Sequence, residues 1–284
     1  MLDKNTEILI VGLGLMGGSY ARALTAAGYR VSAIDSDPEA IRYALSEGMI
    51  AAGAAHPDPD LIGRADLVIL ALYPQVLLSW IDRYQGFLKT GALLTDVTGV
   101  KGAIVPRVQE KLRPDVEFIA AHPMAGREVS GVRNSTKEMF RGANYIVVPT
   151  EKNTAGAIAA CRALGEALGF ARVSELSLAE HDEIIGFVSQ LTHCIAVALM
   201  TCNDDQHLEE YTGDSFRDLT RIARINDEMW SELFLLNRDA LLSQIDAFTA
   251  QLTRLRATVA TGNRDEMRAL MRRSALRRAK FDKE

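Results

Sequence analysis

Residues 7–19 read EILIVGLGLMGGS, a short apolar run followed at once by a cluster of glycines. The run is rich in β-branched residues, as expected for a parallel strand that is buried on both faces. A helical segment, SYARALTAAG, follows at 19–28, and a second strand, YRVSAID at 29–35, ends in an acid. This order of strand, glycine-rich turn, helix and strand predicts the first unit of a doubly wound α/β sheet.

The glycines match G-x-G-x-x-G in the context that this motif requires, and they predict a dinucleotide site. Gly12 permits the tight turn, Gly14 lets the backbone approach a pyrophosphate, and Gly17 allows close packing of helix on strand. Asp35 accepts hydrogen bonds from an adenosine ribose and repels a 2′-phosphate, which predicts NAD rather than NADP. The expected cofactor-binding residues are Gly12, Leu13, Gly14, Leu15, Met16, Gly17, Asp35 and, after the strand at 65–72, Tyr73.

Strands alternate with helices for about 150 residues, with further strands at 65–72, 92–97, 118–122 and 144–150. From Leu178 onward only helical periodicity is present. We therefore expect a Rossmann-type domain over residues 1–174 and an all-α domain over residues 175–284. The stretch at 171–177 is either a last strand or a linker.

The composition excludes several classes of protein. Hydrophobic residues make up 48% and charged residues 24% of the 284 residues, as in ordinary globular proteins. A net charge of −5 argues against a nucleic-acid binder. Three cysteines without metal-ligand spacing predict no metal site and a reducing compartment. Without a signal peptide, and with no run of roughly 18 apolar residues, we expect a cytoplasmic protein.

A second informative stretch, HPMAGRE at 122–128, follows the apolar run at 118–121. His122 stands where catalytic groups of open α/β sheets lie, past the carboxyl end of a strand. Its ordinary pKa near 6.5 suits a general base at neutral pH. Pro123 restricts the backbone of His122 and helps to aim its ring.

Five ordered motifs together resemble the prephenate/arogenate dehydrogenases of tyrosine biosynthesis. The motifs are GLGLMGGS at 12–19, TDVTGVKG at 95–102, HPMAGREVSGV at 122–132, HD…VSQLTH at 181–193 and FRDLTRIA…MW at 216–230. The resemblance implies an NAD(P)-binding Rossmann domain, a helical dimerisation domain and a homodimer. It also implies oxidative decarboxylation of prephenate to 4-hydroxyphenylpyruvate, with hydride transfer to NAD.

The resemblance also implies roles for individual residues. His122 matches the catalytic histidine, Glu128 an acid near the substrate mouth, and His193 a substrate-contacting histidine. Ser189 lies four residues before His193, is expected on the same helix face and is a further candidate for substrate binding. Arg221 matches the carboxylate-binding arginine; it shares one expected cationic helix face with Arg217 and Arg224.

The sequence departs from the family pattern at two positions. Gly99 stands where members often have a serine that orients the histidine, so Thr98 is a candidate to supply the hydroxyl. Gln190 stands where members often have a second histidine. Lys101 and His181 are interpreted as structural residues, His181 at the domain junction.

This function has three alternatives, of which two are other dehydrogenases and the third is not an enzyme. Arogenate dehydrogenase activity would act on an amino acid in place of the keto acid, and the sequence barely separates the two. A β-hydroxyacid dehydrogenase would use a helix lysine as acid or base, but the segment 181–202 contains none. A non-catalytic dinucleotide-binding sensor would not need His122, His193 and Arg221 together.

Overall fold

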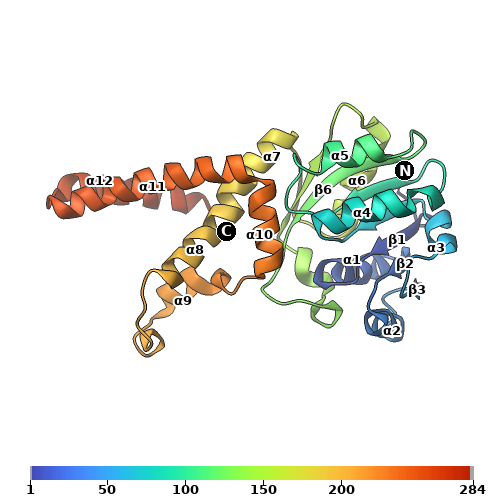
Figure 1. The fold of residues 1–284 in the computed structure, drawn as a ribbon, viewed down its shortest axis with the longest axis horizontal. Helices are drawn as coiled ribbons and strands as arrows, with labels where there is room; N and C mark the ends of the chain where they lie inside the picture. Colours follow the sequence, from blue (N-terminus) through green and yellow to red (C-terminus); the bar gives the residue numbers. More distant parts are fainter. Residues whose placement is uncertain (1, 282–284) are drawn as a thin grey trace. The chain divides into compact units, whose positions relative to one another are not determined.

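An eight-stranded sheet with helices on both faces forms the N-terminal part of the computed structural model, which describes residues 2–281 (Figure 1). The strand order is β3-β2-β1-β4-β5-β6-β7-β8. The strands from β1 to β6 are parallel, β7 is antiparallel to β6, and β8 is parallel to β7. The strands are β1 (Glu7–Val11), β2 (Arg30–Ile34), β3 (Ala52–Ala54), β4 (Leu67–Leu70), β5 (Leu93–Asp96), β6 (Glu117–Met124), β7 (Asn144–Val148) and β8 (Arg172–Glu175).

Two helical layers cover the sheet, which confirms the doubly wound class. One layer contains α1 (Leu15–Ala26), α2 (Pro38–Ser46) and α6 (Ala155–Ala167); the other contains α3 (Pro59–Arg64), α4 (Pro74–Tyr84) and α5 (Val105–Lys111). In β1, Ile8 and Ile10 face the first layer, whereas Leu9 and Val11 face the second. All four side chains are buried, because a central parallel strand has no solvent-facing side.

The sequence patterns missed β3 and α3. The three-residue strand β3 reads Ala-Gly-Ala and carries no β-branched signal. The signal for α3 was present, since Asp58 caps its amides and Pro59 occupies its first turn. Both elements are short, which is why periodicity did not reveal them.

The described residues from 178 to 281 form helices joined by short loops and contain no strand, as predicted. It contains α7 (Leu178–Ile185), a π-helical segment (Gly186–Leu191), α8 (Thr192–Thr201), α9 (Asp214–Thr220) and α10 (Asp227–Leu236), then α11 (Arg238–Ala260) and α12 (Arg264–Arg278). Contacts divide the chain into two compact units, 1–237 and 238–284. The second unit is a hairpin of α11 and α12, joined by an ion pair between Arg254 and Glu266 at 2.9 Å.

One helical segment is more apolar than we expected. Residues 178–201 form 24 continuous helical residues, and an 18-residue window within them has a mean hydropathy of 1.7, enough by length and composition to cross a membrane. The expectation that no such segment exists was therefore wrong. The segment also carries His181, Asp182 and Gln190, which hydrogen-bond to other parts of the first unit.

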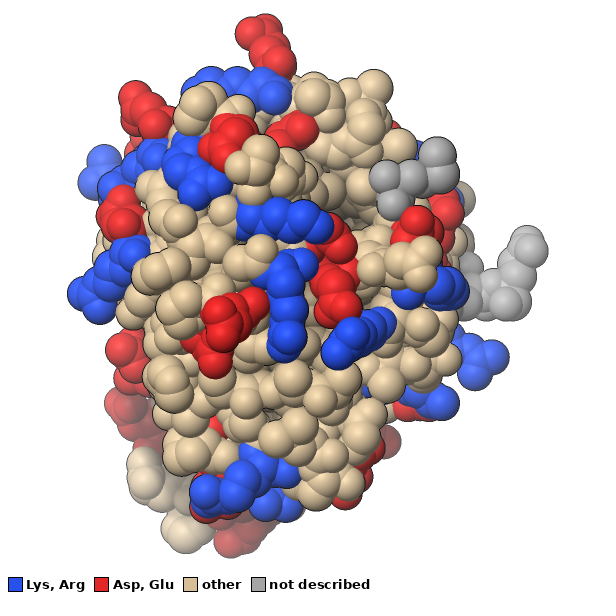
Figure 2. Space-filling view, turned by 90° about the vertical axis from the view of Figure 1, so that its right-hand side faces the viewer, with Lys and Arg blue, Asp and Glu red and all other residues tan. Residues whose placement is uncertain are grey.

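Charged side chains of both signs are interspersed on the face shown in Figure 2. No field of a single sign covers that face, in keeping with the small net charge of −5.

Candidate active site

The loop between β1 and α1 requires glycine for steric reasons. Gly12 has a φ of +94°, and a Cβ on it would lie 2.4 Å from the carbonyl oxygen of Ala71. A Cβ on Gly17 would lie 1.8 Å from the carbonyl oxygen of Gly12. Around Gly14, by contrast, no described heavy atom lies within 4 Å of the Cβ position. The loop is therefore closed at its ends and open at Gly14, where a phosphate can approach the backbone.

The first turn of α1 keeps its amides free of side-chain caps. Gly14 is the N-cap, no side chain hydrogen-bonds to this helix end, and the first turn holds no acid. Such a helix end attracts an anion because its amides and the helix dipole both point toward it. Asp35, at the end of β2, lies beside this loop and accepts hydrogen bonds from the backbone amides of Leu13 and, at 2.8 Å, Asp37.

The other expected cofactor residues lie around the same loop. Leu13 is buried, Leu15 and Met16 are half-buried in the first turn of α1, and Tyr73 is exposed at the start of α4. Because β4 is the neighbour of β1 in the sheet, Tyr73 and the glycine loop lie at one edge of the sheet.

The catalytic-histidine candidate lies on β6 and not beyond its end, which corrects the sequence-based expectation. The parallel pairing of β6 with β5 ends at Ile119, but its antiparallel pairing with β7 continues through His122 to Met124. The Ala121 amide points toward β5 and donates to Asp96, and the nitrogen of Pro123 points the same way. Pro123 is tolerated because β5 has already ended on that side, so no ladder bond is lost.

A chain of three side chains begins at His122. Its Nδ1 lies 2.9 Å from Nε2 of His181, whose Nδ1 lies 2.7 Å from Oδ1 of Asp182. Asp182 also accepts hydrogen bonds from the amides of Lys101, at 2.9 Å, and Gly102, at 2.7 Å. His181 is fully buried in the first turn of α7, which begins with a capping box at Ser177.

Sequence reasoning missed the partnership of His181 with His122 because the two residues are 59 positions apart. The available signal was the pair His181-Asp182 at the start of an apolar helix, since a buried histidine next to an acid is rarely without a partner.

The surroundings of His122 favour its neutral form. Burial lowers the pKa of His122 well below 6.5, and the nearby His181 and Lys101 lower it further. Burial likewise lowers the pKa of His181, although its hydrogen bond to Asp182 acts in the opposite direction. Burial alone would raise the pKa of Asp182, but hydrogen bonds from His181 and from the two backbone amides outweigh it and hold the carboxylate ionised.

Lys101 lies beneath the site in a buried ion pair. Its Nζ lies 2.6 Å from Oδ2 of Asp96 and donates to the carbonyl of Ala121 at 2.6 Å. Neither side chain of the ion pair is exposed to solvent. The hydroxyl of Thr98 has two acceptors within reach of its single proton, the Asp96 carboxylate and the carbonyl of Val100. Both contacts direct the Thr98 hydroxyl into this buried network.

Gly99 lies against His122. A Cβ at this position would lie 3.9 Å from Cε1 of His122 and 3.7 Å from the methyl groups of Leu233. The position at which family members often carry serine is therefore beside the histidine ring. Thr98 belongs to the network beneath it.

His193 lies in a second cluster, on the first turn of α8. Its Nδ1 lies 2.9 Å from the backbone carbonyl of Ser189, and its ring stacks on Trp230 of α10 at 3.7 Å between centroids. The π-helical segment that ends at Leu191 precedes it; such segments are frequent at functional sites. Burial lowers the pKa of His193 below 6.5, while the Ser189 carbonyl acts in the opposite direction. The sequence-based list of site residues did not include Trp230.

Arg221 forms an ion pair with Glu128, a contact between segments 93 residues apart. Burial raises the pKa of Glu128, but a backbone hydrogen bond and the pairing with Arg221 outweigh this effect and lower it. The prediction that Arg217, Arg221 and Arg224 share one continuous helix face is wrong. Helix α9 ends at Thr220 and a 3₁₀ turn (Arg221–Ala223) follows, so Arg221 lies at a helix end and is exposed.

Helix α10 connects the two clusters. Leu233 lies beside Gly99, one turn after Trp230, which stacks on His193. The carboxylate of Glu232 accepts a hydrogen bond from the amide of Gln75, at the start of α4, at 3.0 Å. The buried Gln190 donates to the carbonyl of Leu233 at 3.1 Å. The histidine pair, the stacked His193 and the dinucleotide loop thus belong to one folded unit.

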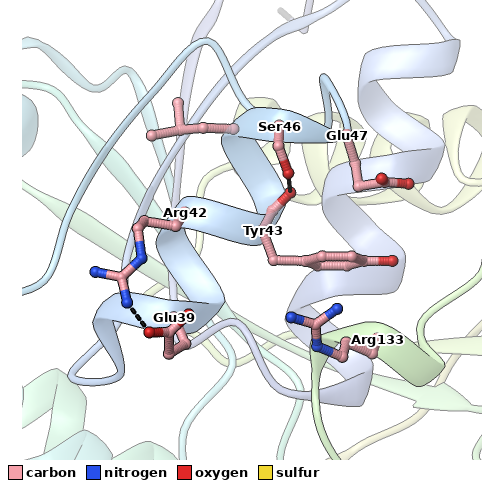
Figure 3. A pocket seen from close by; sticks show the side chains of 7 residues that line it. Glu39, Arg42, Tyr43, Ser46, Glu47 and Arg133 are labelled. Atoms are coloured by element: carbon pink, nitrogen blue, oxygen red, sulfur yellow. Dashed lines mark hydrogen bonds and ion pairs between the residues drawn. The ribbon is translucent and has the colours of Figure 1, made fainter.

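A separate surface hollow of about 690 Å³ lies outside this site, against α2 (Figure 3). Tyr43 forms its wall, with the guanidinium of Arg133 4.5 Å from the ring centroid. Arg42 pairs with Glu39 at its rim. None of the residues that line the hollow belongs to the candidate active site.

Comparisons with known proteins agree over both halves of the chain. Residues 20–174 match the family model for the prephenate dehydrogenase nucleotide-binding domain, and residues 177–273 match the model for the prephenate dehydrogenase dimerization domain. The chain is 30% identical over 268 residues to a prephenate dehydrogenase of Bacillus subtilis, covering 91% of this chain and 71% of that protein.

Two further similarities are equally extensive. A cyclohexadienyl dehydrogenase of Zymomonas mobilis is 30% identical over 267 residues, covering 91% of this chain and 90% of the relative. A crystal structure of prephenate dehydrogenase from A. aeolicus, in complex with hydroxyphenyl propionate and NAD+, superposes with a TM-score of 0.89 at 29% identity, over 98% of each chain.

Proposed function

Because the chain belongs to the prephenate dehydrogenase family, we propose that it catalyses the oxidative decarboxylation of prephenate to 4-hydroxyphenylpyruvate in tyrosine biosynthesis. One observation carries the proposal: His122, held by His181, lies at the edge of the sheet that also carries the open dinucleotide loop. This arrangement brings a proton acceptor to the edge at which α/β proteins bind their cofactors.

NAD is the proposed cofactor, and bound there it would accept a hydride from C4 of the substrate ring. The unobstructed backbone of Gly14 and the uncapped start of α1 fit its pyrophosphate. The Asp35 carboxylate fits the ribose hydroxyls and opposes the 2′-phosphate of NADP. The A. aeolicus structure that contains NAD+ supports this assignment.

His122 is the proposed general base. It takes the proton of the C4 hydroxyl as that carbon loses its hydride, and the loss of CO2 from C1 then makes the ring aromatic. We propose no direct contact of Thr98 with the substrate, because its hydroxyl is engaged below the site. The serine expected from the family is absent at Gly99, so His122 acts without that hydroxyl.

Arg221 and His193 are the proposed substrate-binding residues. Prephenate carries two carboxylates, and a guanidinium binds a carboxylate bidentately while keeping its charge. In this structure Arg221 is paired with Glu128, so a substrate carboxylate must share or replace that partner. The bond from His193 to the Ser189 carbonyl requires a proton on Nδ1 when the ring is neutral, which leaves Nε2 as an acceptor.

The experiment is a steady-state assay of reduced-nucleotide formation by the full chain. Prephenate and arogenate are each tested with NAD and with NADP. We expect turnover with prephenate and NAD; a preference for arogenate would establish the alternative activity. No turnover with either substrate, from a protein that binds NAD, would favour a non-catalytic dinucleotide sensor and contradict the proposal.

We further propose a cytoplasmic homodimer with its domain boundary near residue 174. The match of residues 177–273 to a dimerization domain supports the dimer. So does the set of large apolar side chains exposed in the single chain, among them Phe187, Val188, Met200, Val259 and Leu276. The ranges matched by the two family models support the boundary. Light scattering should give about twice the 31.1 kDa chain mass; a monomer at micromolar concentration would contradict the dimer.

A further inference from the structure

The hydrogen-bond chain behind His122 has a defined direction. The amides of Lys101 and Gly102 donate to Asp182, so this carboxylate acts only as an acceptor. It therefore accepts a hydrogen bond from Nδ1–H of His181. A neutral His181 that is protonated on Nδ1 presents a bare Nε2. That Nε2 faces Nδ1 of His122 at 2.9 Å and accepts a hydrogen bond from it.

The consequence concerns the other nitrogen of His122. A neutral imidazole carries one proton, so a His122 that is protonated on Nδ1 has a bare Nε2. We infer that His181 and Asp182 are positioning residues that hold His122 in its Nδ1–H tautomer, so that Nε2 is the atom that accepts the substrate proton. This inference rests on the proposed function for its chemical consequence but not for the tautomer itself.

The proton transfer balances without a further reactant. The C4–H electron pair leaves as hydride, and the O–H pair becomes the second bond of a carbonyl while the proton binds Nε2 of His122. The pair of the C1–carboxylate bond then enters the ring as CO2 leaves, which gives a phenolate. The phenolate takes the proton back from Nε2. In this sequence His122 carries the proton between the hydride transfer and the protonation of the phenolate.

The charges around His122 keep the resting ring neutral, so that it is able to accept the substrate proton. The charges of Lys101 and His181 disfavour a positive charge on His122, and both therefore favour its neutral form. Asp96, on β5, is paired with Lys101, while Asp182 is linked to His122 through the ring of His181. When His122 becomes an imidazolium, its Nδ1–H donates more strongly toward His181, and the Asp182 carboxylate stabilises the charge spread over the two rings.

Nitrogen NMR of the histidine rings tests the tautomer directly in the full-length protein without substrate. The chain has five histidines, and the spectrum of His122→Asn identifies the His122 signals. We expect the wild-type ring to be protonated on Nδ1, and His181→Phe to populate the Nε2–H form. A wild-type His122 protonated on Nε2 would overturn the inference, and this measurement needs no variant at His181.

Kinetics test whether His181 acts through His122. His181→Phe should lower kcat with prephenate at least about tenfold, with little change in KM. The loss should not exceed the roughly 10²- to 10⁴-fold that a general base contributes to kcat. The double variant His122→Asn/His181→Phe should have the same kcat as His122→Asn alone, because His181 acts only through the His122 ring, which is already absent. Multiplicative losses would overturn the inference. His207→Gln, an exposed histidine substitution, is the matched control.

The two hypotheses fail in different ways. If the wild-type protein turns over neither prephenate nor arogenate, the proposed function fails while the NMR result still decides the tautomer. If turnover occurs but the tautomer is wrong, only the positioning role fails.

Discussion

Lys101→Met removes the cation of the buried ion pair beneath the site while keeping a side chain of similar length. The Nζ contacts with Asp96 and with the Ala121 carbonyl, both at 2.6 Å, disappear. Asp96 retains the amides of Thr98 and Ala121 but is left as a buried carboxylate without a cation. Breaking a buried pair on one side costs about 3–5 kcal/mol, a large fraction of the total stability of a typical domain.

Urea unfolding, followed by tryptophan fluorescence, gives the loss in free energy of unfolding by linear extrapolation. In a separate thermal unfolding experiment, the melting temperature should fall by roughly 6–20 °C. The matched control is Lys111→Met, because Lys111 pairs with Asp82 at 2.6 Å on the exposed surface. That control should change the free energy of unfolding by no more than about 1 kcal/mol. Equal losses from the two variants would refute the argument that burial makes the Lys101 pair different.

The same variant has a second consequence, for catalysis. Burial is the main cause of the low pKa of His122, and the charges of His181 and Lys101 add to it. In folded Lys101→Met protein the pKa of His122 should rise, so the acidic limb of the pH profile of kcat/KM should move to higher pH. An acidic limb that moves to lower pH would contradict this electrostatic account of the site.

Three further predictions concern substrate binding, pH and the departure from the family motif. Arg221→Gln should mainly raise KM for prephenate, because the guanidinium binds carboxylate in ground and transition states alike; a loss confined to kcat would contradict that role. Burial lowers the pKa values of His122, His181 and His193 below 6.5, so the folded protein binds fewer protons than the unfolded chain. The free energy of unfolding should have its full value above about pH 6.5 and should decrease as the pH falls below that value. The fully buried His181 contributes at most about 1.4 kcal/mol of this decrease per pH unit. Urea unfolding at about pH 7.5 and about pH 5.5 should reveal the decrease, and equal free energies at the two pH values would refute the prediction. Gly99→Ala and Gly99→Ser should both fold with unchanged or slightly higher stability, since the added Cβ meets only ordinary contacts, and Ser alone should change kcat. Equal kcat values for the two Gly99 variants would show that a hydroxyl has no effect there.

Much of the first domain could be predicted from local sequence. The glycines at 12, 14 and 17 were found from the motif alone. The structure requires glycine at 12 and 17 for steric reasons, whereas Gly14 leaves the backbone open. Strands of alternating buried faces, such as β1, were found from their apolar runs. The break between α9 and the turn at Arg221 was not found, because helical periodicity continues across it in the sequence.

The candidate site was predicted less completely. His122, His193 and Arg221 were named from their motifs, and their roles stay predictions. The contacts that define their surroundings join residues far apart in the chain, such as His122 with His181 and His193 with Trp230. No local pattern reports these pairs, because they depend on how α7 and α10 pack against the ends of β5 and β6.

The sequence by itself determined the class of the fold and the dinucleotide loop, since both follow from periodicity and from the conformations open to glycine. Only the tertiary structure decided which groups surround His122, the proposed catalytic histidine. Lys101 and Asp96 form a buried pair below it, and His181 with Asp182 orients it from the side. The physical reason is that buried polar groups must find partners, and the identity of each partner is fixed by the packing of distant segments.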